Sequence, residues 1–124
     1  MISCVIIDDE EVAREGMKIL IDQIEFLELK GSFANALEAD IFLKKNPIDL
    51  LFLDIHMPKL NGLEYLKMKQ HHTRVILTTA YTDHAIEAFE YGAIDYAFKK
   101  SIYWNTIYRL KQNERNAVSS TRSN

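Results

Sequence analysis

The stretch LLFLD, residues 50–54, decides the expected fold of this chain. Four consecutive apolar residues are typical of a strand buried on both faces of a parallel sheet, and the run ends on a carboxylate, Asp54. Similar apolar runs occur at residues 4–7, 75–79 and 94–98, with a weaker one, expected at an edge, at 28–33. Because helical patterns separate these runs, we expect one α/β domain in which helices cover both faces of a parallel sheet.

Apolar spacing also predicts the helices. The first helix should follow residue 10, where apolar or small residues recur at helical spacing: Val12, Gly16, Ile19, Leu20 and Ile24. Asn35 is expected to cap a second helix that carries Leu37 and Ile41 on one face. A short third helix is expected through Leu63 and Leu66. Two more are expected, one ending near residue 92 and one from residue 102 onward.

Composition limits the class of protein. The chain has 124 residues, of which 48% are hydrophobic, and a net charge of -3, which fits one soluble domain and gives no overall basic field for nucleic acid. No apolar run approaches the roughly 20 residues needed to span a bilayer, so we expect a cytoplasmic protein with no membrane contact. Cys4 lies in the first apolar run and is predicted to be a buried, inert thiol. Residues 1–115 should form the domain, and 116–124 a polar tail or truncated linker.

Polar residues follow the predicted strands, at what should be a single edge of the sheet. They are Asp8 and Asp9 after the first strand, Asp54 after the third, Thr78 and Thr79 after the fourth, and Lys99 and Lys100 after the fifth. Each has an ordinary explanation when taken alone, since acidic residues suit a helix N-terminus and threonine suits a strand. Together, three carboxylates in one small pocket would repel one another, and a Mg²⁺ ion with oxygen ligands would remove that repulsion.

Such a pocket suits a phosphoryl group. A metal and the ammonium group of Lys99 would neutralise the phosphoryl oxygens, and Thr79 could donate a hydrogen bond to them. One carboxylate could also act as the nucleophile and form an aspartyl phosphate. The spacing leaves open which one reacts; we favour Asp54 because its strand is the most apolar and therefore the most central.

Four motifs in order make the chain recognisable: VIIDDE, LLFLDIHMPKLNG, VILTTAY and GAIDYAFKK. Together they resemble the receiver domain of two-component response regulators, over residues 2–110. The run TTAYTDHAIEAFEYGAIDY resembles in particular the receivers that precede LytTR-type DNA-binding domains. The resemblance implies a flavodoxin-like, doubly wound parallel sheet of five strands in the order 2-1-3-4-5, with five helices.

The resemblance also implies a role for each acidic residue. Asp54 would accept a phosphoryl group from a sensor histidine kinase. Asp8 and Asp9 would supply carboxylates to the Mg²⁺ site, which Asp54 also joins, and the backbone carbonyl of His56 would be a further ligand. The domain would catalyse only its own phosphorylation and dephosphorylation, so we do not expect an enzyme that acts on other substrates.

A switch is implied as well. Thr79 and Lys99 would contact the phosphoryl group, and Tyr96 would change rotamer as Thr79 moves. The face formed by the last helix, strand and helix would then change, often to form a homodimer. DNA would be bound only through an output domain that is absent from this chain.

One position departs from the family pattern. Receivers usually carry a proline in a cis peptide after the site lysine, whereas this chain has Lys100. A cis bond before a non-proline residue costs about 2.5–4 kcal/mol, against roughly 0.5–1 kcal/mol before proline. We therefore predict a trans Lys99–Lys100 bond, an altered loop and a last helix capped by Ser101.

Two other functions stay open from the residues alone. A phosphohydrolase of the haloacid-dehalogenase type would need a second acid two residues after the nucleophile, where this chain has His56, and usually carries a substrate cap. A non-enzymatic adaptor would have lost the switch, and Lys100 is the one mark in its favour. Nucleotide binding has no support, because neither a GxxxxGK[ST] loop nor a GxGxxG loop occurs.

Histidines and aromatic residues outside the motifs gave two further expectations. His71 and His72 should lie in a solvated loop rather than at a metal. Tyr103 and Trp104 cannot both face inward on one helix stripe with Ile107, so at least one is expected near the surface. The face of the last two helices and the last strand is therefore a candidate dimer surface, with core packing as an equal alternative.

Overall fold

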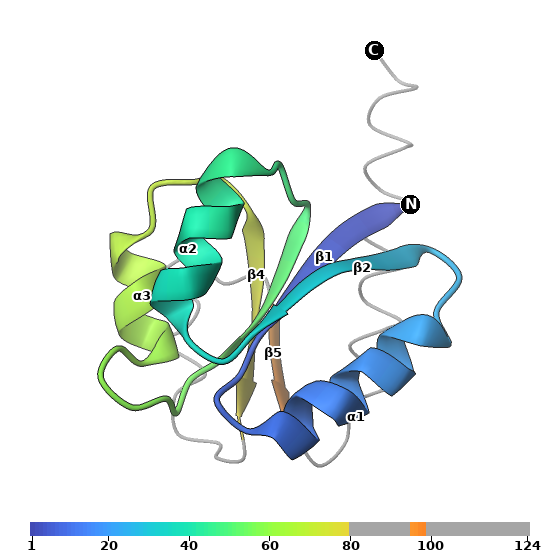
Figure 1. The fold of residues 1–124 in the computed structure, drawn as a ribbon, viewed down its shortest axis with the longest axis horizontal. Helices are drawn as coiled ribbons and strands as arrows, with labels where there is room; N and C mark the ends of the chain where they lie inside the picture. The colour runs from blue at the N-terminus through green and yellow to red at the C-terminus, as the bar shows by residue number, and fades with distance from the viewer. Residues whose placement is uncertain (80–94, 99–124) are drawn as a thin grey trace.

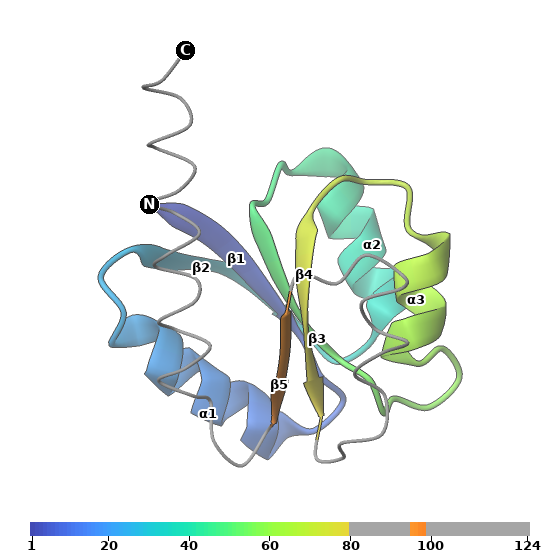
Figure 2. The same ribbon diagram turned by 180° about the vertical axis from the view of Figure 1, so that it is seen from behind.

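The fold is a parallel sheet with helices on both faces, described in a computed structural model for residues 1–79 and 95–98 (Figure 1). The strands are β1 (Ile2–Ile7), β2 (Leu27–Phe33), β3 (Leu50–Asp54), β4 (Arg74–Thr79) and β5 (Asp95–Phe98). The helices among these residues are α1 (Glu11–Asp22), α2 (Ala36–Lys45) and α3 (Gly62–Met68). Figures 1 and 2 show α1 on one face of the sheet and α2 and α3 on the other.

The sheet has the order β2-β1-β3-β4-β5, and all of its neighbouring strands are parallel. The parallel α/β architecture predicted from the apolar runs is thus confirmed. β3 is central and all five of its residues are buried, whereas β2 is an edge strand, as expected. Leu53 pairs with Ile7 on one side and with Leu77 on the other, so β1, β3 and β4 end side by side.

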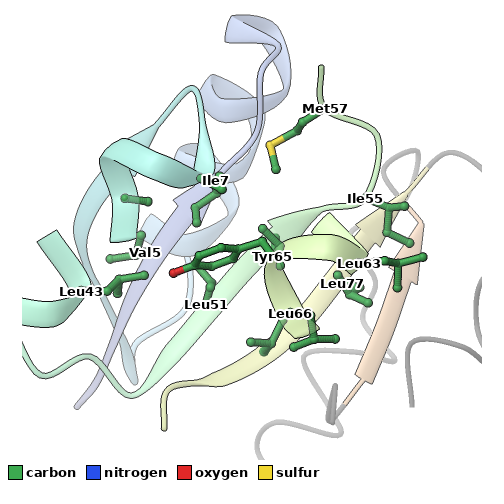
Figure 3. Packing of buried hydrophobic residues seen from close by; sticks show 14 of the residues in the cluster. Val5, Ile7, Leu43, Leu51, Ile55, Met57, Leu63, Tyr65, Leu66 and Leu77 are labelled. Atoms are coloured by element: carbon green, nitrogen blue, oxygen red, sulfur yellow. The ribbon is translucent and has the colours of Figure 1, made fainter. Parts of the chain in front are cut away.

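Alternate residues of the central strands fill two separate hydrophobic cores. Val5, Ile7, Leu51 and Leu53 face α2 and α3 in one cluster, where Figure 3 shows Tyr65 among the apolar side chains. Cys4, Ile6 and Phe52 face α1 in the other, so the predicted burial of Cys4 is confirmed. Both faces of the sheet are therefore covered, which explains why the strands read as continuous apolar runs rather than as alternating ones.

The inward face of α1 differs from the expected stripe. Met17 and Ile21 are its buried residues, one helical turn apart, whereas the side chains of Val12 and Ile19 are 85% and 62% exposed. Successive helix residues are about 100° apart. Val12, five residues before Met17, and Ile19, two residues after it, therefore point away from the side of the helix that meets the sheet.

The second helix shows a similar difference. Asn35 caps α2 as predicted, and its side-chain oxygen accepts a hydrogen bond from the N–H of Glu38 at 2.9 Å. Leu37 and Ile41 do share a face, but it is the outer one, where they are 57% and 61% exposed. The buried residues are Ala36, Ala39 and Leu43. The two alanines are small, which lets the helix backbone approach the core closely.

The short third helix is confirmed, with Leu63 and Leu66 buried. The predicted fourth and fifth helices, the Ser101 cap, the surface position of Tyr103 or Trp104 and the polar tail all lie outside the described residues. Within residues 1–79 and 95–98, no helix is long and apolar enough to cross a membrane.

Candidate functional site

Asp54 is the last residue of the central strand, and its side chain is completely buried. Its Oδ1 accepts a hydrogen bond from the backbone N–H of His56 at 3.1 Å, which limits rotation of the carboxylate. Strand pairing places Asp54 opposite Thr78. On the other side of β3, Leu53 pairs with Ile7, so Asp8, the residue after Ile7, lies next to Asp54, the residue after Leu53. The two carboxylates that the sequence placed at this edge are thus on neighbouring strand ends.

Asp8 is held from several directions and is only 3% exposed. Its Oδ1 accepts from the N–H of Glu10 at 3.0 Å, and its own N–H donates to the carbonyl oxygen of Phe33 at 3.0 Å. Nη1 of Arg14 donates to the carbonyl oxygen of Asp8 at 2.8 Å. This residue is therefore fixed where β1 turns into α1.

Carboxylate oxygens gather at this turn. One oxygen from each of Asp8, Asp9 and Glu10 lies within 4.8 Å of the other two, with Asp8 buried and the others exposed. Hard carboxylate oxygens beside one another are suitable ligands for Mg²⁺, which also keeps several waters on its open side. The donor set thus fits the ion that the resemblance implies. Glu10, which directly follows the two aspartates in the sequence, is a neighbour in this cluster that sequence reasoning did not predict.

The segment after Asp54 is anchored by backbone hydrogen bonds. The N–H of Ile55 donates to the carbonyl oxygen of Thr78 at 3.1 Å, and the N–H of Gly62 donates to the carbonyl oxygen of Ile55 at 2.9 Å. Ile55 and Met57 are buried, whereas the side chain of His56 is exposed. The expected contribution of the His56 backbone carbonyl to the Mg²⁺ site stays a prediction.

The remaining predicted residues come from the ends of β4 and β5. Thr79 pairs with Phe98 in the sheet, so β5 ends beside β4, which in turn lies next to β3 with Asp54 at its end. The side chains of Thr79 and Tyr96, and all of Lys99 and Lys100, lie outside the described residues. The predicted contacts of these side chains and the trans Lys99–Lys100 bond stay predictions.

A second polar cluster, which sequence reasoning missed, lies between α2, α3 and the loop before β4. The hydroxyl of the fully buried Tyr65 donates to Oδ1 of Asp40 at 2.6 Å and lies 2.7 Å from Nε2 of His71. The His71 side chain is only 11% exposed, so its expected place in a solvated loop is wrong, while His72 is exposed as expected. Buried hydroxyl groups are normally hydrogen-bonded, and the hydrogen bond with the Tyr65 hydroxyl accounts for the inward position of His71.

Burial sets the protonation of this cluster. It raises the pKa of Tyr65, and the hydrogen bond to Asp40 adds to that effect. Burial lowers the pKa of His71, and the nearby Lys69 lowers it further, while Asp40 acts in the opposite direction. Tyr65 and His71 are therefore both held in their neutral forms.

Comparison with known proteins identifies the family. The sequence model of the response regulator receiver domain matches residues 4–106. The transcriptional regulatory protein BtsR of Salmonella typhi is 40% identical over 117 residues, which are 90% of this chain and 49% of that protein. The Escherichia coli K12 protein of the same name is 37% identical over the same shares of both chains. The chain spans about half the length of these curated relatives.

Solved structures agree with this result. The response regulatory domain of mrkE from Klebsiella pneumoniae superposes with a TM-score of 0.75 at 28% identity, covering 99% of this chain and 100% of that one. The response regulator domain of Thermotoga maritima CheB superposes with a TM-score of 0.76 at 30% identity, covering 96% and 97%. This chain belongs to the response regulator receiver domain family.

Proposed function

We propose that this domain is a phosphorylation switch in which Asp54 accepts a phosphoryl group from the phosphohistidine of a sensor kinase. The observation that carries the proposal is the burial of two carboxylates, Asp54 and Asp8, at neighbouring strand ends. Burying two like charges side by side costs free energy unless an opposite charge compensates them. A bound divalent cation would supply that charge and would also bind the oxygens of a phosphoryl group.

Asp8, Asp9 and Asp54, with the backbone carbonyl of His56, would hold Mg²⁺. Glu10 belongs to the same acidic cluster, but it is the N-cap residue of α1, and we assign it no ligand role. When bound, the ion neutralises negative charge on the phosphoryl oxygens and on the carboxylates. The hydrogen bond from the His56 N–H holds one oxygen of Asp54 in place.

Phosphoryl transfer is a displacement at phosphorus. An oxygen of the Asp54 carboxylate attacks, a P–O bond forms and the P–N bond to the kinase histidine breaks. The electron pair of that bond leaves with the imidazole, which takes up a proton. Lys99 and Thr79 would stabilise the charge on the three phosphoryl oxygens. Water attack on the aspartyl phosphate would later reset the switch, so the domain catalyses only its own phosphorylation and dephosphorylation.

The signal would leave the site through β4 and β5. Thr79 would move toward the phosphoryl group and Tyr96 would change rotamer, which alters the face of the last helix, strand and helix. That face is the candidate homodimer surface. The relatives are named transcriptional regulators and are about twice as long as this chain, which supports an output domain beyond the receiver. Its LytTR type is proposed from the resemblance of residues 78–96 alone. We expect the full protein to act in the cytoplasm.

Intact-mass spectrometry tests the proposal directly. The domain is incubated with Mg²⁺ and acetyl phosphate, with Asp54→Asn treated in parallel. A single labile adduct of phosphoryl mass, absent from Asp54→Asn and from samples with EDTA, is the expected result. Fast donor hydrolysis without an adduct would instead favour the phosphohydrolase. An absence of both adduct and Mg²⁺ affinity would favour the adaptor.

A further inference from the structure

Gly62, the first residue of α3, lies directly against the backbone of Asp54. A Cβ atom at this position would overlap the carbonyl oxygen of Asp54 and would lie 2.9 Å from both the Asp54 carbonyl carbon and Cα of Ile55. All three contacts are with backbone atoms, which cannot rotate aside as a flexible side chain can. Any side chain at Gly62 must therefore displace either α3 or the peptide that follows Asp54.

Hydrogen bonds hold the peptide that follows Asp54 in place and link it to the start of α3. β3 is held between β1 and β4, and the N–H of Ile55 is bonded to Thr78 of β4. The N–H of Gly62 donates to the carbonyl oxygen of Ile55, which closes residues 55–62 into a ring. The same ring carries the His56 N–H that binds Oδ1 of Asp54. Displacing the start of α3 therefore disturbs the group that orients the carboxylate.

The direction of this helix start is also fixed. Asn61 and Glu64 form a capping box, in which Oδ1 of Asn61 accepts from the N–H of Glu64 at 2.9 Å and Oε1 of Glu64 accepts from the N–H of Asn61 at 3.1 Å. Such a box satisfies two backbone donors at the helix start. Together with the hydrogen bond from the Gly62 N–H to the carbonyl oxygen of Ile55, it fixes the first turn of α3 next to the Asp54 peptide.

We propose that Gly62 is a positioning residue for phosphoryl transfer: its lack of a side chain lets the first turn of α3 press on the Asp54–Ile55 peptide and so hold the Asp54 carboxylate in its reactive orientation. The inference rests on the proposed role of Asp54 as phosphoacceptor. A purely structural role is the alternative, in which Gly62 matters for packing and stability but not for the rate of transfer.

The chain supplies matched controls for Gly62→Ala. An added Cβ at Gly16, within α1, would meet no atom within 4 Å, so Gly16→Ala tests the same substitution in open space. Leu66, one turn after Gly62 on the same face of α3, is 4% exposed in the core, so Leu66→Ala destabilises the same helix by leaving a cavity there, without touching the Gly62 contact.

The experiment measures the rate of Asp54 phosphorylation against acetyl phosphate concentration, at a temperature where melting curves show every variant folded. We expect Gly62→Ala to lower the maximum rate about tenfold or more, since small misplacements of reacting groups have large effects on rate. The half-saturating donor concentration should stay within about twofold of wild type. Leu66→Ala should lower the melting temperature but keep the wild-type rate. Gly16→Ala should reduce neither the melting temperature nor the rate. Equal rates for Gly62→Ala and Leu66→Ala would overturn the inference.

A second pair of variants covers the case in which Gly62→Ala does not fold. Asn61→Ala and Asn35→Ala each remove a helix cap with the same 2.9 Å hydrogen bond, but only Asn61 adjoins the Gly62 contact. Asn61→Ala should slow phosphorylation severalfold and Asn35→Ala should not; equal rates would again overturn the inference. If wild type and Gly16→Ala form no Asp54 adduct, the proposed function itself fails, and the inference falls with it.

Discussion

The hydroxyl of Tyr65 lies between Oδ1 of Asp40, 2.6 Å away, and Nε2 of His71, 2.7 Å away. A phenol has one proton to donate. Because Asp40 receives it, His71 must supply the proton of the second hydrogen bond from Nε2, which defines its neutral tautomer. Nδ1 of His71 is then an acceptor, and it is buried with no hydrogen-bond partner among the described residues. These three residues join α2, α3 and the loop before β4.

Removing the hydroxyl should destabilise the domain. In Tyr65→Phe, Nε2–H of His71 would remain buried without an acceptor, and Asp40 would lose its short hydrogen bond. We expect the free energy of unfolding to fall by about 1–3 kcal/mol, measured by urea denaturation. Lys44→Gln is the control, because Lys44 is 61% exposed and its 3.0 Å ion pair with Asp40 is a surface pair worth at most about 0.5 kcal/mol. Equal losses in the two variants would contradict this assignment.

Stability should also depend on the protonation of His71. Burial, with Lys69 in support, lowers the pKa of His71 in the folded state, although Asp40 opposes the shift. Lys69 is close because its Nζ donates to the carbonyl oxygens of His71 and Thr73. The unfolded chain therefore binds this proton more tightly. The contribution of neutral, buried His71 to the free energy of unfolding is complete above the unfolded pKa of about 6.5. It is lost as the pH falls from there toward the lower pKa of the folded state.

The measurement compares the free energy of unfolding at several pH values between neutral and mildly acidic. His71→Gln should show a shallower loss of stability than wild type across this range. His72→Gln, at the exposed neighbouring position, should keep the wild-type dependence. A wild-type slope in His71→Gln would show that other groups cause the acid sensitivity. The carboxylates of the site are present in both variants and cancel in this comparison.

Sequence reasoning succeeded where the backbone pattern alone decides the outcome. Apolar runs located the strands, and because parallel strands end at the same edge, they also brought Asp8 and Asp54 together. Spacing showed that Leu37 and Ile41 share a helix face but not which way it points, since that depends on how α2 packs on the sheet. The burial of His71 depends on Asp40 and Tyr65, which it meets only in the folded chain.

Magnesium should stabilise the folded domain, because an ion that binds only the native state shifts the unfolding equilibrium. At a free concentration about 100 times the dissociation constant, the gain is roughly 2.7 kcal/mol. We expect the melting temperature to rise with MgCl₂ and to return to its original value with EDTA. Asp9→Asn, at the exposed carboxylate of the cluster, should largely abolish the rise. Glu15→Gln, an exposed acid on α1, should retain it.

Cys4 offers a chemical probe of the same folding equilibrium. The thiol is completely buried in β1, and its Sγ lies 3.5 Å from the carbonyl oxygen of Glu28. Burial, with the nearby charge of Glu28, raises the pKa of Cys4 to about 12. Because the thiolate is the reactive form, the native protein should not react with a thiol reagent such as Ellman's reagent at pH 8. The denatured chain should react with one equivalent, since the sequence contains one cysteine.

The rate of that reaction should report global unfolding rather than local opening, because β1 is hydrogen-bonded to both β2 and β3. When opening and closing are fast, the rate is proportional to the unfolded fraction, and each 1.4 kcal/mol of lost stability speeds it about tenfold. Tyr65→Phe should therefore react about 5- to 150-fold faster than wild type, in proportion to its loss in urea. Equal reaction rates for Tyr65→Phe and wild type would mean that Cys4 becomes accessible through local opening of β1.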